Sequence, residues 1–423
     1  MTNVLVVGNG AREHALCHAL LRSPGLSSLR CTPGNAGTAA IAENVSANLE
    51  DPEQVLRVAR VQPTDLVVVG PEVPLAAGLA DGLRELGILT FGRDAGAARI
   101  ESSKAWAKEL MRGIGVPTAR AIVVTSHAEA SRAVDQVGFP AVIKADGLAA
   151  GKGVTVAADL AESEAALEDL FQRRSLGAAA DIVVVEECLT GPELSVLAFC
   201  DGERIALVPP ARDYKAAYDG GRGPNTGGMG AYTRPGFATP GLLARVLLEI
   251  LEPTVRELAR RGTPFVGVLY AGLMITDSGP KVIEFNCRFG DPEAQVILPL
   301  LESDLLETLM AVADGNLDPT TLRWSDDILC GVVVASGGYP GVYATGHPIE
   351  GLDAIPPDAL VFHAGTRRRE DGVVVTAGGR VLTVVGRGAT RDEAREQAYA
   401  AAASITFEGA RYRTDVGDED VPK

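Results

Sequence analysis

Alternation of apolar runs with helix-like stretches across the first hundred residues is the feature that most constrains this fold. Apolar runs at residues 4–7, 66–69 and 88–91 indicate strands, and stretches at about 11–21 and 75–86 indicate helices. Strands that alternate with helices form an open parallel sheet, which binds ligands at the carboxyl ends of its strands. Loops follow these ends, and their candidate ligand-binding residues are Gly8, Asn9, Gly10, Gly34, Asn35, Gly37, Gly70, Pro71 and Glu72.

The first of these loops begins with the Gly-x-Gly pattern of dinucleotide-binding proteins, but Glu13 stands where the third glycine is expected. A carboxylate there would repel a pyrophosphate and crowd the helix against the strand, so the sequence disfavours a dinucleotide site. The loop can still bind a single phosphate or a small polar ligand, with Arg12 nearby. The alternative is a tight turn that needs glycine for its backbone angles.

The remainder of the chain indicates further domains. Residues 118–190 combine short strands and helices in a compact α+β unit. Asp201-Gly202 and Asp277-Ser278-Gly279 predict hairpins in a larger antiparallel sheet, with a long helix over about 239–261 between them. The chain after Trp324 is rich in strands and ends in a helix. We therefore expect an α/β and α+β multidomain protein with domains at 1–102, 103–325 and 326–423, the second divided into 118–190 and 191–325.

The charge balance excludes several classes of partner. The chain has 55 acidic and 39 basic residues and a net charge of −16, whereas a surface for nucleic acid or anionic membrane is basic.

No apolar run approaches the ~18 residues of a spanning helix, and no export signal is visible, so we expect a cytoplasmic protein. The six cysteines are scattered singly, which supports neither a disulfide scaffold nor a zinc site.

Lysine is scarce, with seven lysines among the 39 basic residues. Lys144 ends an apolar strand, where an unpaired ammonium would be costly to bury. A polyphosphate would explain this placement, because a glycine-rich loop closes its N–H groups over phosphates while Lys144 neutralises their charge. The alternative is an ordinary hairpin loop with a surface lysine, and Lys108 and Lys423 are expected to lie on the surface. The loop residues concerned are Gly147, Gly151, Lys152 and Gly153.

An acidic segment follows the next apolar strand, at residues 182–185. In a cleft, backbone groups from Glu186 to Leu189, which include Glu187, could meet an adenine edge. Glu193 could accept hydrogen bonds from both ribose hydroxyls, the role that acids play in other nucleotide folds. The alternative is a solvated acidic loop.

Polar residues recur at every second position in the segment that follows residue 283. Glu284, Asn286 and Arg288 lie on one face of a strand by this spacing. Oxygen ligands at Glu284 and Asn286 suit a Mg²⁺ ion that bridges phosphates, and Arg288 suits the transferred phosphoryl group. The alternative is a solvated sheet face.

Residues 223–232, Gly-Pro-Asn-Thr-Gly-Gly-Met-Gly-Ala-Tyr, contain four glycines. Such a composition does not predict a regular element, so we expect a flexible loop or a backbone nest for an anion. Either structure would lie near a ligand. Polar residues of this region are Asp213, Lys215, Asn225 and Thr226, and the glycines beside Thr226 are Gly227 and Gly228.

Taken together, these motifs resemble the phosphoribosylamine–glycine ligases, also called glycinamide ribonucleotide synthetases, of the ATP-grasp superfamily. The resemblance covers nearly the whole chain and rests most specifically on residues 223–232 joined to Glu-Phe-Asn-Cys-Arg-Phe-Gly-Asp-Pro-Glu at 284–293. It implies an ATP-grasp fold with an N-terminal parallel α/β domain and a small C-terminal β-rich domain. The implied reaction is the ligation of glycine to phosphoribosylamine through glycyl phosphate, in de novo purine synthesis, with ATP and Mg²⁺ or Mn²⁺; we expect a monomer.

The resemblance also implies roles for individual residues. Those that would meet ATP are Lys104, Lys144, Gly147, Gly151, Lys152, Gly153, Glu186, Glu187, Leu189 and Glu193. The metal ligands would be Glu284 and Asn286. The residues that would face glycine and phosphoribosylamine are Asp213, Lys215, Asn225 and Arg288. The loops of Gly8 and Gly34, together with Gly70, Pro71, Glu72, Thr226, Gly227 and Gly228, would form the substrate side of the cleft.

The chain departs from this family at two positions near the substrate segment. Similar enzymes carry Gln where Arg212 stands and Arg where Ala216 stands. The other functions compatible with the sequence are a different ATP-grasp carboxylate–amine ligase, an NAD-dependent oxidoreductase and a catalytically silent nucleotide-binding sensor.

Overall fold

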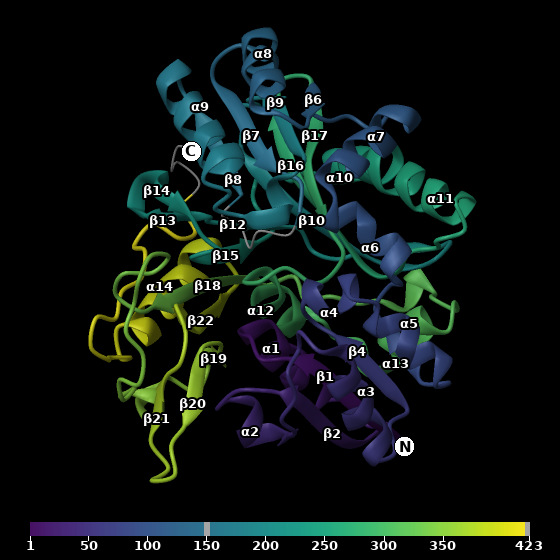
Figure 1. The fold of residues 1–423 in the computed structure, drawn as a ribbon. Coiled ribbons are helices and arrows are strands. Elements are labelled where there is room, and N and C mark those ends of the chain that lie inside the picture. Colours follow the sequence, from purple (N-terminus) through teal and green to yellow (C-terminus); the bar gives the residue numbers. More distant parts are fainter. Residues whose placement is uncertain (148–152, 419–423) are drawn as a thin grey trace.

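The computed structural model describes residues 1–147 and 153–418 (Figure 1). Its N-terminal domain is an open parallel sheet of order β3-β2-β1-β4-β5, as the alternation of strands and helices predicts. Val4 and Val6 of β1 share a core with helix α1, whereas Leu5 and Val7 pack with α3 and α5 on the other face. The elements are β1 Thr2–Gly8, α1 Ala11–Leu20, β2 Leu26–Pro33, α2 Thr38–Ile41, β3 Glu43–Asn44, α3 Pro52–Val61, β4 Leu66–Val69, α4 Glu72–Ala76, α5 Leu79–Glu85 and β5 Leu89–Phe91.

The prediction of one helix over residues 75–86 is wrong, because the structure has two shorter helices there, α4 and α5. Gly78 separates them and adopts φ +82°, a left-handed conformation that cannot continue a right-handed helix. Helix α4 begins at Glu72, separated by two residues from the end of β4, so Glu72 lies at the carboxyl edge of the sheet.

Helices α6 and α7 lead from this domain to a smaller antiparallel sheet of order β6-β9-β7-β8. One face of this sheet packs on helices α8 and α9 (Figure 1). Its other face carries Val142, Lys144 and Glu186 and borders a cleft. The elements are α6 Ala95–Ser102, α7 Lys104–Ile114, β6 Ala121–Val124, α8 His127–Val137, β7 Ala141–Ala145, β8 Val154–Ala157, α9 Leu160–Leu167, a π-helical turn Glu168–Gln172, a 3₁₀ turn Gly177–Ala180 and β9 Val183–Glu187.

The large antiparallel sheet has the order β17-β16-β10-β12-β15-β18-β22-β19, with β11 beside β10. Both predicted hairpins are present in it, as β10–β11 and β16–β17. Strands β18, β22 and β19 come from the chain after residue 325, so this sheet runs without interruption across the expected domain boundary. The strands are β10 Glu193–Asp201, β11 Ile205–Leu207, β12 Ala211–Asp213, β15 Gly230–Thr233, β16 Val266–Thr276, β17 Gly279–Asn286, β18 Ile328–Ala335, β19 Leu360–His363 and β22 Arg380–Gly388.

The glycine-rich segment at residues 223–232 is more regular than its composition predicts. Its first part belongs to strand β14 (Arg222–Asn225), which pairs with β13 (Ala216–Tyr218) in a separate hairpin. Its last part belongs to β15 of the large sheet, so the expectation of no regular element is wrong there. Glycine is required at Gly230 for another reason: it adopts φ +158°, and a Cβ atom there would lie 2.6 Å from the carbonyl oxygen of Gly331 on β18.

The long helix expected over residues 239–261 consists of α10 (Pro240–Val246), a π-helical turn (Leu247–Leu251) and α11 (Glu252–Arg260). Pro253 has no N–H to donate along the helix, which accounts for the irregular turn before it. Other helices in the rest of the chain are α12 Glu293–Ile297, α13 Leu305–Ala313 and α14 Arg391–Ala402, and a small hairpin pairs β20 Thr366–Arg368 with β21 Val374–Thr376. In the part of the chain that the structure describes, no helix is long and apolar enough to cross a membrane.

The N-terminal domain meets the C-terminal part at a pair of histidines, His14 and His363, of which His14 is buried. The backbone N–H of His363 donates to Nδ1 of His14 at 2.9 Å. Burial, with smaller contributions from His363 and His18, lowers the pKa of His14 from 6.5 to about 3. The folded chain therefore keeps His14 neutral while the unfolded chain binds a proton below pH 6.5, so stability falls as the pH falls.

Replacing His14 with asparagine keeps an acceptor for His363, because Oδ1 of asparagine takes the place of Nδ1, and it removes the titrating group. Between pH 7 and pH 5, the free energy of unfolding of the wild type should fall by about 2 kcal/mol more than that of His14→Asn. Urea unfolding followed by circular dichroism at both pH values measures this difference. Parallel losses in the two proteins would contradict the assignment.

Candidate active site

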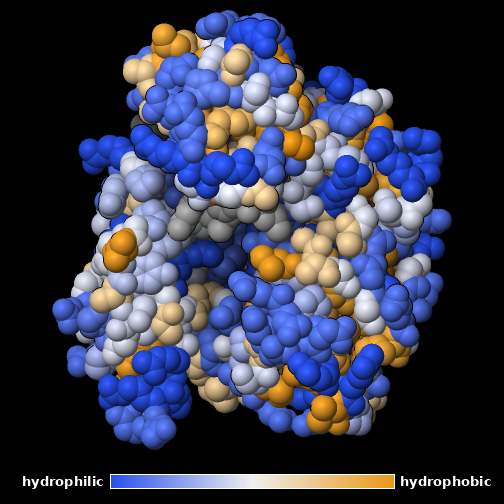
Figure 2. All heavy atoms as spheres, viewed as in Figure 1, coloured by the Kyte–Doolittle hydropathy of each residue, from blue (hydrophilic) through white to orange (hydrophobic). Residues whose placement is uncertain are grey.

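A cleft of about 560 Å³ lies between the small sheet, the large sheet and the N-terminal domain. Figure 2 shows the molecule hollowed near the centre of this face. Most of the residues that the sequence singled out line this cavity. They are Pro71, Glu72, Lys104, Lys144, Gly153, Glu186, Glu187, Leu189, Glu193, Asp213, Lys215, Asn225, Thr226, Gly227, Glu284, Asn286 and Arg288.

The structure does not bring every predicted residue to the wall of this cavity. Within residues 1–147 and 153–418, the predicted residues that do not line it are Gly8, Asn9, Gly10, Gly34, Asn35, Gly37, Gly70, Gly147 and Gly228. Gly151 and Lys152 lie outside the described residues. Gly10 is close to the wall, because a Cβ atom on it would lie 3.6 Å from Oδ2 of Asp291, a lining residue.

Glu13 occupies the N-terminus of α1 with its own carboxylate. Oε2 accepts a hydrogen bond from the N–H of Gly10 at 2.6 Å, and Oε1 accepts one from Nε of Arg12 at 2.6 Å. A Cβ atom on Gly8 or Gly70 would approach this side chain to 2.4 Å or less. The place that a dinucleotide pyrophosphate takes at a helix N-terminus is therefore filled, which agrees with the sequence argument against that site.

Asn35 holds loops together at the edge of the N-terminal sheet. Its Nδ2 donates to the carbonyl oxygens of Asn9 and Gly10 at 3.0 and 3.2 Å and to that of His363 at 2.7 Å. Its Oδ1 accepts from the N–H of Gly37 at 2.8 Å. The side chain thus supports the shape of these loops through contacts within the protein.

A buried ionic cluster joins α7 to the small sheet at the base of the cleft. Oε2 of Glu186 lies 3.1 Å from Nζ of both Lys108 and Lys144. The expectation that Lys108 lies on the surface is wrong, because it is only 7% exposed and its Nζ also donates to Thr118 Oγ1 at 2.6 Å. Burial lowers the pKa of Lys108 to about 8, although the Glu186 carboxylate opposes this shift. Oε1 of Glu186 is buried without a hydrogen-bond partner among the described residues.

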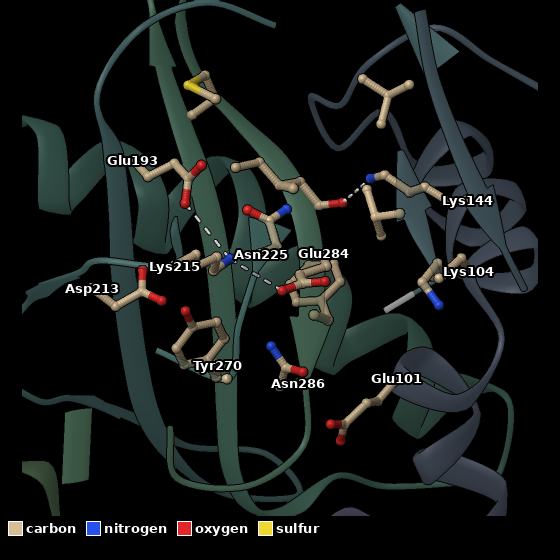
Figure 3. Close-up of a pocket in the computed structure, with 18 of the residues that line it drawn as sticks. Glu101, Lys104, Lys144, Glu193, Asp213, Lys215, Asn225, Tyr270, Glu284 and Asn286 are labelled. Atoms are coloured by element: carbon tan, nitrogen blue, oxygen red, sulfur yellow. Dashed lines mark hydrogen bonds and ion pairs between the residues drawn. The ribbon is translucent and has the colours of Figure 1, made fainter. Parts of the chain in front are cut away.

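Strand β17 directs its polar residues into the cleft beside this cluster. Glu284, rather than Ile283, pairs with Gly272 of β16, and the register shifts there. The carbonyl oxygen of Ile283 accepts a hydrogen bond from Nζ of Lys144 at 3.2 Å (Figure 3). This contact fixes the lysine of the small sheet against the large sheet.

Lys215 connects two carboxylates across the cleft. Figure 3 shows its ammonium between Glu193 and Glu284, at 3.6 and 3.4 Å from their nearest oxygens. Burial alone would raise the pKa of the Glu284 carboxyl, but the neighbouring ammonium groups of Lys215, Lys144 and Lys104 together hold it below its ordinary value. Glu284 is therefore an anion next to the lysines predicted to meet phosphates.

Arg288 lies among acidic side chains at the end of β17. Its guanidinium is 3.3 Å from Oε2 of Glu72 and 3.5 Å from Oε1 of Glu101. Glu101 also accepts from the backbone N–H of Cys287 at 2.8 Å and pairs with Arg93 at 3.1 Å. The sequence analysis missed Glu101, and only the packing of α6 on the end of β17 places it there.

Further residues that the sequence did not single out line the cleft. Tyr270 OH lies 2.9 Å from Ser195 Oγ, which donates to Oε1 of Glu293 at 3.1 Å. Glu293 is the last residue of the motif at 284–293, so the motif could have identified it as a candidate site residue. The remaining lining residues with polar contacts include Asp291 and Arg380, whose Nη2 donates to Asp291 Oδ2 at 2.8 Å.

Glu284 and Asn286 offer adjacent oxygen donors at the end of β17, and both line the cleft beside Lys104 (Figure 3). Among residues 1–147 and 153–418, no group of three or more His, Cys, Asp or Glu side chains is placed to hold a metal ion. Magnesium that also binds substrate phosphates commonly takes only one or two protein carboxylates. The donor set therefore fits a divalent ion of this kind.

Comparison with protein families matches the chain along most of its length. Residues 2–101 match the N domain of phosphoribosylglycinamide synthetase. Residues 102–294 match its ATP-grasp (A) domain, and residues 329–419 match its C domain.

Curated relatives and solved structures agree with this result. The chain is 52% identical to a phosphoribosylamine–glycine ligase of Streptomyces coelicolor and 50% identical to one of a Nostoc species, over 98% of each chain. A crystal structure of phosphoribosylamine–glycine ligase from Thermotoga maritima matches with a TM-score of 0.85 and 33% identity, over 98% of this chain and 99% of that one. The biotin carboxylase domain of 2-oxoglutarate carboxylase from Hydrogenobacter thermophilus shares the fold, with a TM-score of 0.77, 15% identity and coverage of 97% and 92%. The chain therefore belongs to the phosphoribosylglycinamide synthetase family of ATP-grasp ligases.

Proposed function

We propose that this protein ligates glycine to 5-phosphoribosylamine at the expense of ATP, giving glycinamide ribonucleotide, ADP and phosphate in purine biosynthesis. The observation that carries the proposal is a single cavity in which Lys104 and Lys144 lie beside Glu284 and Asn286, with Arg288 further along the same strand end. Such a cavity can hold a nucleoside triphosphate against a small carboxylate substrate. We further propose that the enzyme acts as a monomer and that it works in the cytoplasm.

On the nucleotide side, Lys104 and Lys144 would neutralise the phosphates. Nζ of Lys104 now donates to the carbonyl oxygens of Asp146 and Gly147 at 3.3 and 3.0 Å, directly before the glycine-rich loop. The free oxygen of Glu186 can accept a hydrogen bond from the amino group of adenine, which would meet its need for a partner. The remaining ATP contacts in this proposal are Gly147, Gly151, Lys152, Gly153, Glu187, Leu189 and, at the ribose, Glu193.

On the acceptor side, Arg288 would bind the glycine carboxylate as a planar fork. The carboxylates of Asp213 and Glu72 line the same region and suit an ammonium group. Lys215 and Asn225 would hold the transferred group and the phosphoribosylamine. The loop residues that complete this side in the proposal are Gly8, Asn9, Gly10, Gly34, Asn35, Gly37, Gly70, Pro71, Thr226, Gly227 and Gly228.

The chemistry needs little covalent help from the protein. A carboxylate is a poor electrophile toward an amine, so the γ-phosphoryl group first joins one of its oxygens and ADP leaves. The amine then attacks the acyl carbon, and that oxygen leaves with phosphate. Side chains and backbone dipoles stabilise the charges, and enclosure keeps water from the acyl phosphate. A Mg²⁺ or Mn²⁺ ion held by Glu284 and Asn286 would supply further neutralisation of phosphate charge when bound.

The isotope balance tests this route. Glycine labelled with heavy oxygen in its carboxylate should transfer one labelled oxygen to inorganic phosphate in each turnover, as measured by mass spectrometry of the released phosphate. ADP release is measured with glycine and freshly made phosphoribosylamine, each omitted in turn. Product should accumulate only when both substrates are present. Product formation with unlabelled phosphate would rule out an acyl phosphate, and turnover with another amine in place of phosphoribosylamine would favour a different carboxylate–amine ligase.

A further inference from the structure

The β13–β14 hairpin stands apart from the large sheet. Ala216 pairs with Asn225 and Tyr218 pairs with Arg222, in a sheet that these strands form by themselves. The residues of β14 are exposed. An isolated hairpin is marginally stable in water, so contacts from outside the hairpin must hold its position.

This hairpin carries residues of the cleft at its base. Lys215 directly precedes β13, and Asn225 is the last residue of β14; both line the cavity. Thr226 closes the base, because its N–H and its hydroxyl each donate to the carbonyl oxygen of Lys215 at 2.8 Å. Lys215 and Asn225 therefore lie where the hairpin joins the large sheet, so a shift of the hairpin displaces both in the cleft.

Residues 411–415, here called the C-terminal strap, bind the tip of the hairpin. The N–H and the hydroxyl of Thr414 donate to the two carboxylate oxygens of Asp219 at 2.8 and 2.7 Å. The N–H of Gly220 donates to Oδ2 of Asp415 at 2.7 Å. The tip and the strap thus exchange hydrogen bonds in both directions.

Two arginines of the strap bind the hairpin along β13. Arg413 donates from Nη1 to the carbonyl oxygen of Ala216 at 2.9 Å, and Arg411 donates to that of Ala217 at 2.9 Å. Arg413 is only 2% exposed and also forms an ion pair with Asp415 at 2.6 Å. Burying a guanidinium is costly unless it is paired and hydrogen-bonded, and here both conditions are met.

The strap is in turn fixed to the C-terminal part of the large sheet. The backbone groups of Arg411 and Ala335 exchange hydrogen bonds of 3.0 and 2.8 Å at the end of β18. The hydroxyl of Tyr399, on α14, donates to the carbonyl oxygen of Arg413 at 2.9 Å. A continuous chain of contacts therefore runs from β18 and α14 through the strap to the base of the hairpin.

We propose that the C-terminal strap is a positioning element for the acceptor side of the active site, with Asp219 and Thr414 as its central contact. The inference rests on the proposed function, because it assigns Lys215 and Asn225 to glycine and phosphoribosylamine. Loss of the contact between Asp219 and Thr414 loosens the hairpin and moves Lys215 and Asn225. On the nucleotide side, Lys104, Lys144 and the small sheet keep their places.

Asp219→Ala tests the proposal, because Asp219 lies at the partly exposed tip and touches none of the proposed substrates. We expect kcat/KM for glycine and for phosphoribosylamine to fall about tenfold, as for the loss of two modest hydrogen bonds. The dissociation constant of a non-hydrolysable ATP analogue should stay within about twofold of the wild type. Hydrogen exchange of residues 216–225 should become faster, whereas exchange of α14 should not change.

The chain offers a matched control in Asp318, which accepts hydrogen bonds from the N–H and hydroxyl of Thr320 at 3.0 and 2.7 Å. Asp318→Ala removes the same pair of contacts at a site that does not line the cleft, and it should leave all constants unchanged. Asp219→Asn should restore most of the activity, since its amide can both accept from the Thr414 N–H and donate to the Thr414 oxygen. Thr414→Val, which loses only the hydroxyl, should have a smaller effect than Asp219→Ala.

Equal constants for Asp219→Ala and Asp318→Ala would overturn the proposal. An equal loss of affinity for the ATP analogue would overturn it too, because it would show a general disturbance of the fold. Failure of the proposed function has a different signature: the wild type itself would release no ADP with glycine and phosphoribosylamine, while hydrogen exchange of the hairpin would still report whether the strap holds it.

Discussion

Replacing Lys144 with methionine is expected to lower kcat/KM for ATP by about 100-fold, because one fixed ammonium is lost from a partly dehydrated phosphate site. Methionine is similar in length and lacks the charge. The strand should survive the change, since Glu186 keeps its ion pair with Lys108 at 3.1 Å when Lys144 is absent. Steady-state kinetics at several ATP concentrations measure the effect, and circular dichroism verifies the fold.

Lys281 provides the control for this substitution. It is a partly exposed lysine that does not line the cavity and pairs with Glu187 at 3.6 Å. Lys281→Met should change kcat/KM for ATP by less than about threefold, as is usual for an exposed ion pair. If folded Lys144→Met retains full turnover and ATP affinity, Lys144 does not bind phosphate.

Replacing Glu284 with glutamine should raise the Mg²⁺ concentration for half-maximal activity by about tenfold or more, because an amide keeps one oxygen but loses the charge that attracts a hard cation. Titrating Mg²⁺ at fixed, saturating ATP measures this shift. The substitution also removes a carboxylate that faces Lys215 at 3.4 Å, so the ATP affinity is measured separately.

Glu187 is a suitable comparison, because its side chain is 34% exposed, as is that of Glu284, and it lines the same cleft on the proposed adenine side. Glu187→Gln should leave the Mg²⁺ midpoint unchanged even if it alters KM for ATP. An identical Mg²⁺ titration for Glu284→Gln and the wild type would disprove the metal assignment.

Local patterns in the sequence predict much of the fold correctly. The alternation of apolar runs with helices predicts the parallel N-terminal sheet, and Asp-Gly and Asp-Ser-Gly turns predict the hairpins β10–β11 and β16–β17. These patterns work because both strand pairing across a short turn and helix amphipathicity depend on neighbouring residues. The continuation of the large sheet from β15 to β18 is not visible in this way, because its partners are far apart in sequence.

The candidate site shows the same difference between features that a local pattern reveals and contacts between residues far apart in the sequence. Lys144 was singled out because it ends an apolar strand, and Glu284 and Asn286 because polar residues at every second position share one face of a strand. Lys108 was missed, although Lys104, Lys108 and Met111 are spaced as one helix face and all line the cleft. Its burial depends on a partner carboxylate on β9, far along the chain, and a single lysine in a helix does not reveal such a partner.

The strap and the pairing of β15 with β18 also bear on how the enzyme is made. Strand β15 leaves the ribosome well before β18, and the strap at residues 411–415 follows later still. The N-terminal sheet pairs only strands from the first hundred residues, so it can fold during synthesis. The large sheet must instead wait with an unpaired edge at β15 until β18 is made, a state that favours aggregation. A ribosome that stalls before residue 411 therefore yields a chain in which the β13–β14 hairpin lacks the strap that holds it.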